Sequence, residues 1–528
     1  MKRVYLILFL ILILASTLRF YKIGIVPLSL TWDEAAVGYN AYSIATYGRD
    51  EYGKAFPIFF RSFGDDKHPI HIYTTAFFTK LFGSNDTSVR LPAAVFGVLN
   101  VFLLFSLTKM LFKKNVIALT AAFFLAISPY NIHFSRFNHE ANFALFWFLA
   151  GLLLFYLSIM KKNRLLPFSV LSFAVCFITY HSSKIVVPAI TILLLILYKK
   201  QLLKDKISFF ISLFIGLIFL IFVILNSQLL GIARINQTGL DIREIKKTQL
   251  FKLTNNESLG RFNLVLTQYS WHFIPDFLFL KGDKNSRLSS NLGEFYLIDA
   301  LFLITGLVYL IRKRSKEGFI VLTWALIAPL PSTLTSEAPH AARAMFMMGS
   351  WHLISALGFY SIINFKNKLS WKIISGVILS TVLIVSLFHY LNYYYGEFAK
   401  RYAIDWQYGM KQIVEYSASH SEFSSIVMTD ERAQPYIFFL YYLKTPLPEY
   451  LNSVIYNNSL SKSYNNVRNF SRYYFVGADL RDSKPEKETI YVVTPSEYDG
   501  LRYKSSFDIK QIINYPNETV AFYIITTK

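Results

Sequence analysis

The chain has 528 residues, of which 54% are hydrophobic and 16% charged, and its formal net charge is +21. This composition is too apolar for an ordinary soluble protein and indicates residence in a membrane. The lysines and arginines lie between apolar runs and form no patch of their own, which argues against a nucleic-acid partner.

The first segment, residues 1–18, has a basic start and an apolar stretch like those of a signal peptide. No small-x-small cleavage site follows it, so the sequence predicts an uncleaved first span. The single cysteine, Cys176, lies in an apolar run and excludes both an internal disulfide framework and a cysteine-based zinc site.

Further apolar runs of roughly 15 to 22 residues follow, each about long enough to cross a ~30 Å hydrocarbon core. They predict a polytopic α-helical membrane protein with about eleven spanning helices. The predicted spans start near Val4, Ser88, Val116, Ala141, Leu165, Ile185, Ile207, Phe295, Phe319, Met345 and Ile373.

Alternate connections between these spans are strongly basic, beginning with Lys2-Arg3 and Lys113-Lys114. The positive-inside rule places them, and the N-terminus, in the cytoplasm of a multi-pass protein of the cell (plasma) membrane. The remaining short connections carry few positive charges, for example Arg136, Lys184 or Arg343, and are predicted outside. All connections fit one alternation between the cytoplasm and the outside. A missed span would place every later loop on the opposite side of the membrane.

Two large loops and the tail are then predicted to lie outside. Residues 1–391 form a transmembrane domain with outer loops 19–87 and 227–294, and residues 392–528 form an extracytoplasmic α/β domain. In this tail, residues 425–429 and 489–494 are typical of strands. Residues 406–416 and 434–443 are typical of helices. Long outer loops on a membrane scaffold predict function at the outer face.

The first outer loop begins with Thr31-Trp32-Asp33-Glu34, followed by a predicted interfacial helix that Gly48 ends. A structural explanation of the two acids is available. Thr31 and Glu34 have the spacing of a capping box, and Asp33 in the first turn suits the helix dipole.

Later in this loop Asp66, Lys67, His68 and His71 crowd the predicted edge of the bilayer. Charged groups beside hydrocarbon are costly, so this cluster is a functional hypothesis, although snorkelling also explains Lys67. His68 and His71 with Asp66 are a weak metal signal. The sequence therefore assigns no metal site and no certain cofactor, and a divalent metal stays open.

Asp33-Glu34 after the first span, followed by Asp66-Lys67-His68-Pro69-Ile70, resembles the GT-C glycosyltransferases of the family 39 type. These are the protein O-mannosyltransferases and the lipid A aminoarabinose transferases. Supporting matches lie at residues 90–93 and 128–136, so the resemblance covers the membrane half. His68 departs from the family pattern, which usually has a proline there, and this puts a direct role of His68 in doubt.

The resemblance implies transfer of a sugar from a polyprenyl-phosphate donor in the lipid to an acceptor hydroxyl on a protein, lipid or cell-surface glycan. It implies that Asp33 is the general base, with Glu34 or Asp66 orienting it or the sugar. Lys67, Arg136 and Arg343 are the implied donors to the phosphate. Both arginines have an alternative explanation, which is binding to lipid headgroups.

Three further residues are weaker candidates. His340 lies in the segment 336–343, which resembles a family segment of similar location. His139 and Glu140 stand beside a predicted span start, where a structural pair is the alternative to a catalytic role. Residues 405–409 differ at two of five positions from the WWDYG motif of oligosaccharyltransferases, and we interpret them as a helix start.

Two other functions compete with a glycosyltransferase. A transporter or lipid flippase predicts inverted repeats, broken helices and ionisable groups near the bilayer midplane, none of which the sequence shows clearly. A noncatalytic member of the family binds glycan through its tail, but the presence of Asp33 and Lys67 argues against it.

Overall fold

The computed structural model describes residues 2–63, 65–161, 164–231, 238–457, 464–476, 482 and 484–528. The chain divides into two compact units. Residues Met1–Tyr21 and Ala93–Asn392 form one, which we name the helical unit. Residues Lys22–Pro92 and Tyr393–Lys528 form the other, the mixed unit, which contains both helices and strands.

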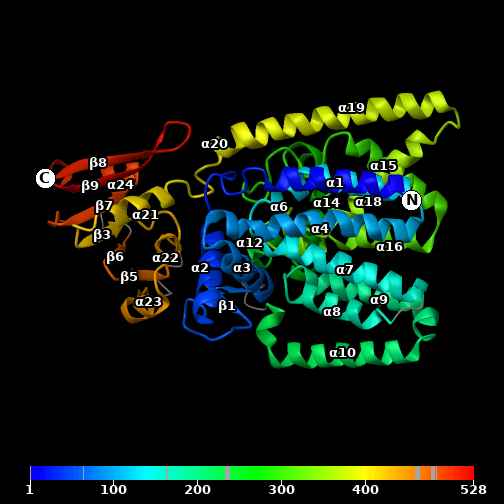
Figure 1. Ribbon diagram of the computed structural model, residues 1–528, viewed down its shortest axis with the longest axis horizontal. Helices are drawn as coiled ribbons and strands as arrows, with labels where there is room; N and C mark the ends of the chain where they lie inside the picture. Colours follow the sequence, from blue (N-terminus) through cyan, green and yellow to red (C-terminus); the bar gives the residue numbers. More distant parts are fainter. Residues whose placement is uncertain are drawn as a thin grey trace. The chain divides into compact units, whose positions relative to one another are not determined.

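A helix lies near each predicted span start (Figure 1). These helices are α1 (Lys2–Phe20), α4 (Asp86–Phe112), α5 (Asn115–Ile127), α7 (Glu140–Lys161), α8 (Leu166–Phe177), α9 (Ser183–Leu202), α10 (Lys206–Leu225), α15 (Asp299–Lys313), α16 (Lys316–Ile327), α18 (Met347–Ile363) and α19 (Leu369–Tyr393). The predicted fold class is confirmed. Within the described residues, 6 helices are long and apolar enough to cross a membrane, so the number of spans stays a prediction.

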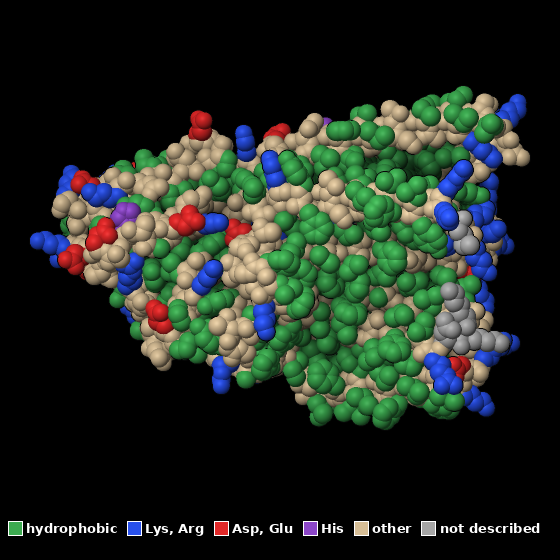
Figure 2. Space-filling model, viewed as in Figure 1, with side chains coloured by type: hydrophobic (Ala, Val, Ile, Leu, Met, Phe, Trp, Pro, Cys, Tyr) green, Lys and Arg blue, Asp and Glu red, His purple; other side chains and the backbone are tan. Residues whose placement is uncertain are grey.

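Small residues let helices of this unit approach closely, as in other membrane bundles. A Cβ atom on Gly306 of α15 would lie 2.0 Å from the carbonyl oxygen of Ile354 in α18. On the other side of the contact, a Cβ on Gly358 would lie 1.8 Å from the oxygen of Phe302. Figure 2 shows apolar side chains along these helices, and lysines and arginines at the end where α1 begins.

Short elements occupy much of the second predicted outer loop and the connections around it. They are α6 (Pro129–Phe134), η1 (Ser227–Leu230), α12 (Ile242–Lys247), α13 (Gln249–Thr254), α14 (Glu257–Trp271), η2 (Asp276–Leu280) and α17 (Leu330–Thr333). Each of α12, α13 and α14 starts with a side-chain N-cap, from Asp241, Thr248 and Asn256. Capping explains why this polar stretch still forms helices.

The mixed unit holds a sheet of seven strands in the order β4-β5-β6-β3-β7-β9-β8. The strands are β3 (Ser425–Met428), β4 (Ile455–Tyr456), β5 (Val467–Phe470), β6 (Tyr473–Phe475), β7 (Thr489–Val493), β8 (Phe507–Asn514) and β9 (Val520–Thr527). Central β3 is parallel to both β6 and β7. The tail segment of the mixed unit also contains the helical elements η3 (Tyr394–Phe398), α20 (Ala399–Arg401), α21 (Met410–Ser419), α22 (Tyr436–Leu443), α23 (Leu447–Ser453), α24 (Pro495–Asp499) and η5 (Lys504–Ser506).

Both predicted strands of the tail are present, and so are the two predicted helices, one of which starts late. Helix α21 begins at Met410 instead of residue 406. Gln407 and Gly409 both have positive φ, of 51° and 105°. These left-handed residues turn the chain before the helix can start.

The first predicted outer loop contributes α2 (Trp32–Tyr47), β1 (Phe60–Ser62), β2 (Asp65–Lys67) and α3 (Pro69–Phe82) to the mixed unit. Tyr39 of α2 and Tyr436 of α22 share one buried core. A Cβ on Gly38 would lie 2.5 Å from the ring of Tyr441, so α2 and α22 pack closely. The compact units therefore differ from our predicted division at residue 391, which left loop 19–87 with the membrane domain.

This packing gives the predicted interfacial helix protein neighbours along much of its length, and its position relative to the membrane stays a prediction. Residues of α2 from Glu34 to Ala41 are buried within the mixed unit. The small side chains Ala35 and Ala36 let neighbouring aromatic residues cover the helix. Gly48 ends α2 in the left-handed conformation, as predicted.

Candidate functional site

Asp33 lies in the first turn of α2, where the helix dipole favours a carboxylate. Its Oδ1 accepts a hydrogen bond from Lys67 Nζ at 2.5 Å. The Asp33 side chain is 46% exposed, whereas that of Lys67 is 16% exposed. The β1-β2 hairpin thus delivers a half-buried cation to a carboxylate that solvent and a substrate can still reach.

Glu34 forms the capping box that the sequence offered as its structural explanation. The Thr31 hydroxyl accepts from the Glu34 backbone N–H at 3.2 Å, and Glu34 Oε2 accepts from the Thr31 N–H at 3.3 Å. Glu34 is fully buried. The side chain is enclosed and both of its oxygens accept hydrogen bonds from the protein. Of the two roles predicted for Glu34, orienting Asp33 or orienting the sugar, these contacts support the first.

Arg90 of α4 is the second partner of Glu34, and the sequence alone predicts no separate role for it. Its Nε donates to Glu34 Oε1 at 2.9 Å and its Nη2 to Oε2 at 3.1 Å. Its remaining donors reach the backbone oxygens of Ile23, Pro27 and Ser29. Arg90 thereby ties the chain before α2 to the start of α4.

The segment 405–409, compared above with the WWDYG motif, also holds the start of α2. Gln407 Oε1 accepts from the Trp32 backbone N–H at 2.6 Å. Trp406 is fully buried, and the guanidinium carbon of Arg90 lies 5.9 Å from the centroid of its ring. This segment supports the helix that carries Asp33, whereas the sequence suggested only a helix start with interfacial aromatic residues.

The other candidates in the first loop take structural positions near Lys67. Asp66 of β2 lies opposite Arg61 of β1 in the antiparallel register of the hairpin. His68 is the N-cap residue of α3, and His71 is buried in its first turn. Within the described ranges, no group of three histidine, cysteine, aspartate or glutamate side chains is placed to hold a metal ion.

In the helical unit, the structure corrects the prediction for Arg136. Its side chain is fully buried, and Nη1 donates to the backbone oxygens of Leu18 and Arg19 at 3.0 and 3.1 Å. The last carbonyl groups of α1 have no partners within the helix and attract this cation. Arg136 is therefore a helix-end residue and not an accessible donor to a phosphate.

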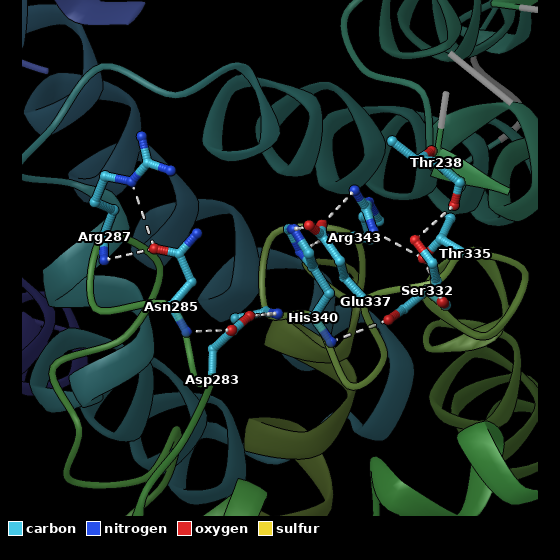
Figure 3. A network of polar contacts seen from close by, with 11 residues as sticks. Thr238, Asp283, Asn285, Arg287, Ser332, Thr335, Glu337, His340 and Arg343 are labelled. Atoms are coloured by element: carbon cyan, nitrogen blue, oxygen red, sulfur yellow. Dashed lines mark hydrogen bonds and ion pairs between the residues drawn. The ribbon is translucent and has the colours of Figure 1, made fainter. Parts of the chain in front are cut away.

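Arg343 has a different environment, at the centre of the network in Figure 3. Its Nη1 donates to Thr335 Oγ1 at 2.7 Å, and its Nη2 lies 3.1 Å from Glu337 Oε2. His340 lies 3.9 Å from the same Glu337 oxygen. Because Glu337 is 68% exposed, the network that holds Arg343 and His340 reaches solvent.

Asp283 is a buried carboxylate in this network that sequence reasoning missed. Its Oδ2 accepts from the Ala341 N–H at 2.6 Å, and its Oδ1 accepts from the Asn285 N–H at 2.8 Å. Burial raises the pKa of Asp283 from 3.8 to about 6. Asp283 thus joins the second predicted outer loop to the segment that carries His340 and Arg343.

Arg287, another residue the sequence did not single out, belongs to the same loop. Its backbone N–H donates to Asn285 Oδ1 at 3.1 Å, and its backbone oxygen lies 2.9 Å from His133 Nε2. Figure 3 shows its side chain beyond Asn285, on the side away from Asp283. Its loop position and half-buried side chain make Arg287 a further candidate for binding an anion.

At the start of α7, the contacts of His139 and Glu140 fit the structural pair that was the alternative to a catalytic role. His139 Nδ1 accepts from the Ala141 N–H at 3.2 Å, and it lies 3.7 Å from Glu140 Oε2. Both side chains are about one-fifth exposed, at 21% and 22%. Their contacts support the first turn of α7 and give no specific evidence for catalysis.

Residues 66–225 match the model of the family described as dolichyl-phosphate-mannose-protein mannosyltransferase. No curated protein matches the chain. Among solved structures, ArnT from Cupriavidus metallidurans bound to undecaprenyl phosphate is 10% identical, with a TM-score of 0.55 over 99% of this chain and 97% of that one.

The Archaeoglobus fulgidus oligosaccharyltransferase tethered to an acceptor peptide is 13% identical. Its TM-score is 0.53 over 98% of this chain and 74% of that one. Its apo form, at a TM-score of 0.50 and 15% identity, is matched over 83% of this chain but only 63% of its own length. At these identities the structural likeness shows the fold, and together with the family match it confirms the resemblance predicted from the motifs.

Proposed function

We propose that this GT-C glycosyltransferase transfers a sugar from a polyprenyl-phosphate donor to an acceptor hydroxyl on the extracytoplasmic face of the membrane. The observation that carries the proposal is the Asp33–Lys67 pair, an accessible carboxylate at a helix start with a cation against it. The region matched by the family model begins in the hairpin that holds Lys67. Undecaprenyl phosphate bound to ArnT supports the class of donor.

Asp33 is proposed as the general base of the transfer. An acceptor hydroxyl is a weak nucleophile, and a carboxylate within hydrogen-bond reach takes its proton as the anomeric carbon is attacked. The new bond joins the acceptor oxygen to that carbon, while the bond from the carbon to the phosphate oxygen breaks. Buried Glu34 and Arg90 act as positioning residues, since they hold the first turn of α2 that carries Asp33.

The leaving polyprenyl phosphate gains negative charge, which fixed cations stabilise. Lys67 in the mixed unit is one proposed donor, and it also forms an ion pair with Asp33. Arg343 and Arg287 are proposed, separately from Lys67, as anion-binding residues within the helical unit. Arg136 is left out of this set, because its guanidinium group is buried at the end of α1.

The proposed orientation has a cytoplasmic N-terminus and an extracytoplasmic C-terminal domain. Its support is the gathering of lysines and arginines at the end of the helical unit where α1 begins (Figure 2). In this orientation the loops that carry Lys67 and Arg343 face outward, where a lipid-linked sugar meets its acceptor.

The test is Asp33→Asn, which keeps the shape of the side chain but removes the base. We expect transfer of radiolabelled sugar from polyprenyl phosphate to acceptors in isolated membranes to fall by about 10²-fold or more. Asp499→Asn, at an exposed ion pair with Lys504 that is distant from Asp33 in the sequence, is the matched control and should transfer sugar normally. Full transfer by a correctly folded Asp33→Asn protein would remove Asp33 as the base.

A further inference from the structure

A pocket of about 230 Å³ lies within the mixed unit, lined by the start of α4, by α21 and by the end of α22. It is smaller than the ~300–1,000 Å³ typical of drug-sized sites. This size suits one ring-sized ligand. The lining residues used below are Asp86, Lys411, Glu415, Ala418, Tyr441 and Tyr442.

Asp86 gives the pocket a hydrogen-bond acceptor that the protein does not use. Its Oδ2 lies 3.2 Å from Lys411 Nζ, and the Lys411 ammonium also lies 5.5 Å from the centroid of the Tyr442 ring. Asp86 Oδ1 is buried and has no hydrogen-bond partner among the described residues. A buried carboxylate oxygen without a donor is costly, and a ligand hydroxyl would satisfy it.

The two tyrosines add the same kind of chemistry. Tyr441 and Tyr442 line the pocket with aromatic surface, and their hydroxyl oxygens are also buried. A tyrosine offers an apolar ring and a polar group at its tip. A ligand with both apolar faces and several hydroxyl groups fits this lining.

The balance of charge selects a neutral ligand. Lys411 and Lys444 stand against Asp86 and Glu415 in the lining. A phosphate would meet both carboxylates while Lys411 is already paired, and a cation would meet both lysines. Hydroxyl groups both donate to carboxylates and accept from ammonium groups, so they suit all four side chains.

The pocket is connected to the proposed base through one turn of α4. Asp86 and Arg90 are four residues apart and so share a face of this helix. Arg90 pairs with Glu34, which caps the helix that carries Asp33. Tyr441 packs against Gly38 of the same helix. A ligand at Asp86 therefore contacts elements that position Asp33.

We propose that this pocket binds one neutral sugar unit of the acceptor, which makes a glycan the class of acceptor. The role as acceptor rests on the proposed function, whereas sugar binding by the pocket does not. Asp86 and Glu415 accept hydrogen bonds from the sugar hydroxyls, Lys411 and Lys444 donate to its oxygens, and the tyrosine rings cover it.

The test measures binding to the purified full-length protein in detergent with no donor present. The probes are methyl glycosides of glucose, mannose, galactose and N-acetylglucosamine, titrated by saturation-transfer NMR. At least one should bind saturably, and Ala418→Phe, which fills the pocket from an exposed position, should weaken it about tenfold or more. Ser419→Phe on the neighbouring exposed position is the matched control and should bind normally.

Asp86→Asn provides an independent variant that leaves the pocket open and should weaken binding by a similar factor. The proposal is overturned if no glycoside binds saturably, or if the Ala418→Phe and Asp86→Asn proteins bind as the wild type does. It is also overturned if glycerophosphoethanolamine displaces the glycoside, because the site would then be one for a lipid headgroup.

The bound glycoside should compete with endogenous acceptor in the transfer assay, and failure to compete would overturn the acceptor role. Asp33→Asn separates this inference from the proposed function. That variant should lose transfer yet bind the glycoside normally. If the wild-type protein binds the glycoside but transfers no sugar from any polyprenyl phosphate, the proposed function fails while the sugar site stands.

Discussion

Glu34 and Arg90 form a bidentate ion pair in which both side chains are 1% exposed. Glu34 comes from the start of α2 and Arg90 from the first turns of α4, 56 residues later. The pair satisfies the charge of each partner where water has no access. It sets the position of the helix start that presents Asp33.

Removal of one partner should destabilise the protein strongly. Glu34→Leu leaves the Arg90 guanidinium buried without its counter-charge, a change that costs about 3–5 kcal/mol at buried pairs. We expect a clearly lower midpoint of thermal unfolding in detergent. Arg243→Ala, which breaks an exposed pair with Asp241, is the control and should unfold as the wild type does. Equal midpoints for Glu34→Leu and the control would contradict this account.

Lys67→Ala should impair use of the donor more than folding. Loss of a charge-assisted hydrogen bond corresponds to about tenfold to a hundredfold lower kcat/KM for the polyprenyl-phosphate sugar. Lys67→Arg should recover part of this loss, since it keeps a cation against Asp33. Lys54→Ala, at an exposed lysine of the same loop, should leave the kinetics unchanged. An unchanged donor dependence in Lys67→Ala would remove Lys67 from the site.

Glu51 should make stability depend on pH. It is buried, its Oε2 accepts from Asn40 at 2.8 Å and its Oε1 from Tyr436 at 3.1 Å. Burial raises its pKa from 4.5 to about 7. Between pH 4.5 and 7 the folded chain binds more protons at Glu51 than the unfolded chain does, so stability falls as pH rises through this range.

The measurement is the unfolding midpoint between pH 5 and 8, compared between wild type and Glu51→Gln. The glutamine cannot ionise, so this variant should lose the part of the pH dependence that Glu51 contributes, up to about 3 kcal/mol. Glu449→Gln, at an exposed acid of the same unit, should keep the wild-type dependence. Parallel pH curves for wild type and Glu51→Gln would show that Glu51 does not titrate in this way.

Variants of Arg136 and of Arg343 should differ in the quantity that they change, which is stability for Arg136 and the KM for the donor for Arg343. Arg136→Leu leaves the final carbonyl groups of α1 without their donor and should lower the unfolding midpoint, with the KM for the donor little changed in the folded fraction. Measurement of both quantities in one membrane preparation tests this. A raised KM with normal stability would restore Arg136 as a phosphate contact.

Arg343→Ala should show the opposite pattern. Its network reaches solvent through Glu337, so we expect about a tenfold higher KM for the donor with a small change in stability. Arg261→Ala, at an exposed ion pair of α14, is the control for removal of one positive charge from the helical unit. A KM equal to that of the control would exclude Arg343 from donor binding.

The sequence alone determined the positions of the membrane helices and the candidate loop. Apolar runs have the length of a bilayer, and the alternation of basic connections constrains every loop at once. The capping box at Thr31 and Glu34 was also readable, because it depends only on residues three apart. The family motif was needed to raise Asp33 above that structural explanation.

Only the tertiary structure decided which charges stay accessible. Asp33 and Glu34 are adjacent in sequence, yet one is 46% exposed while the other is sealed against Arg90. Arg136 and Arg343 occupy similar predicted loops, yet Arg136 is fully buried whereas Arg343 forms an ion pair with the exposed Glu337. Burial and the identity of each hydrogen-bond partner arise from contacts between segments far apart in the chain, such as Trp32 with Gln407. Local sequence patterns do not predict such long-range contacts.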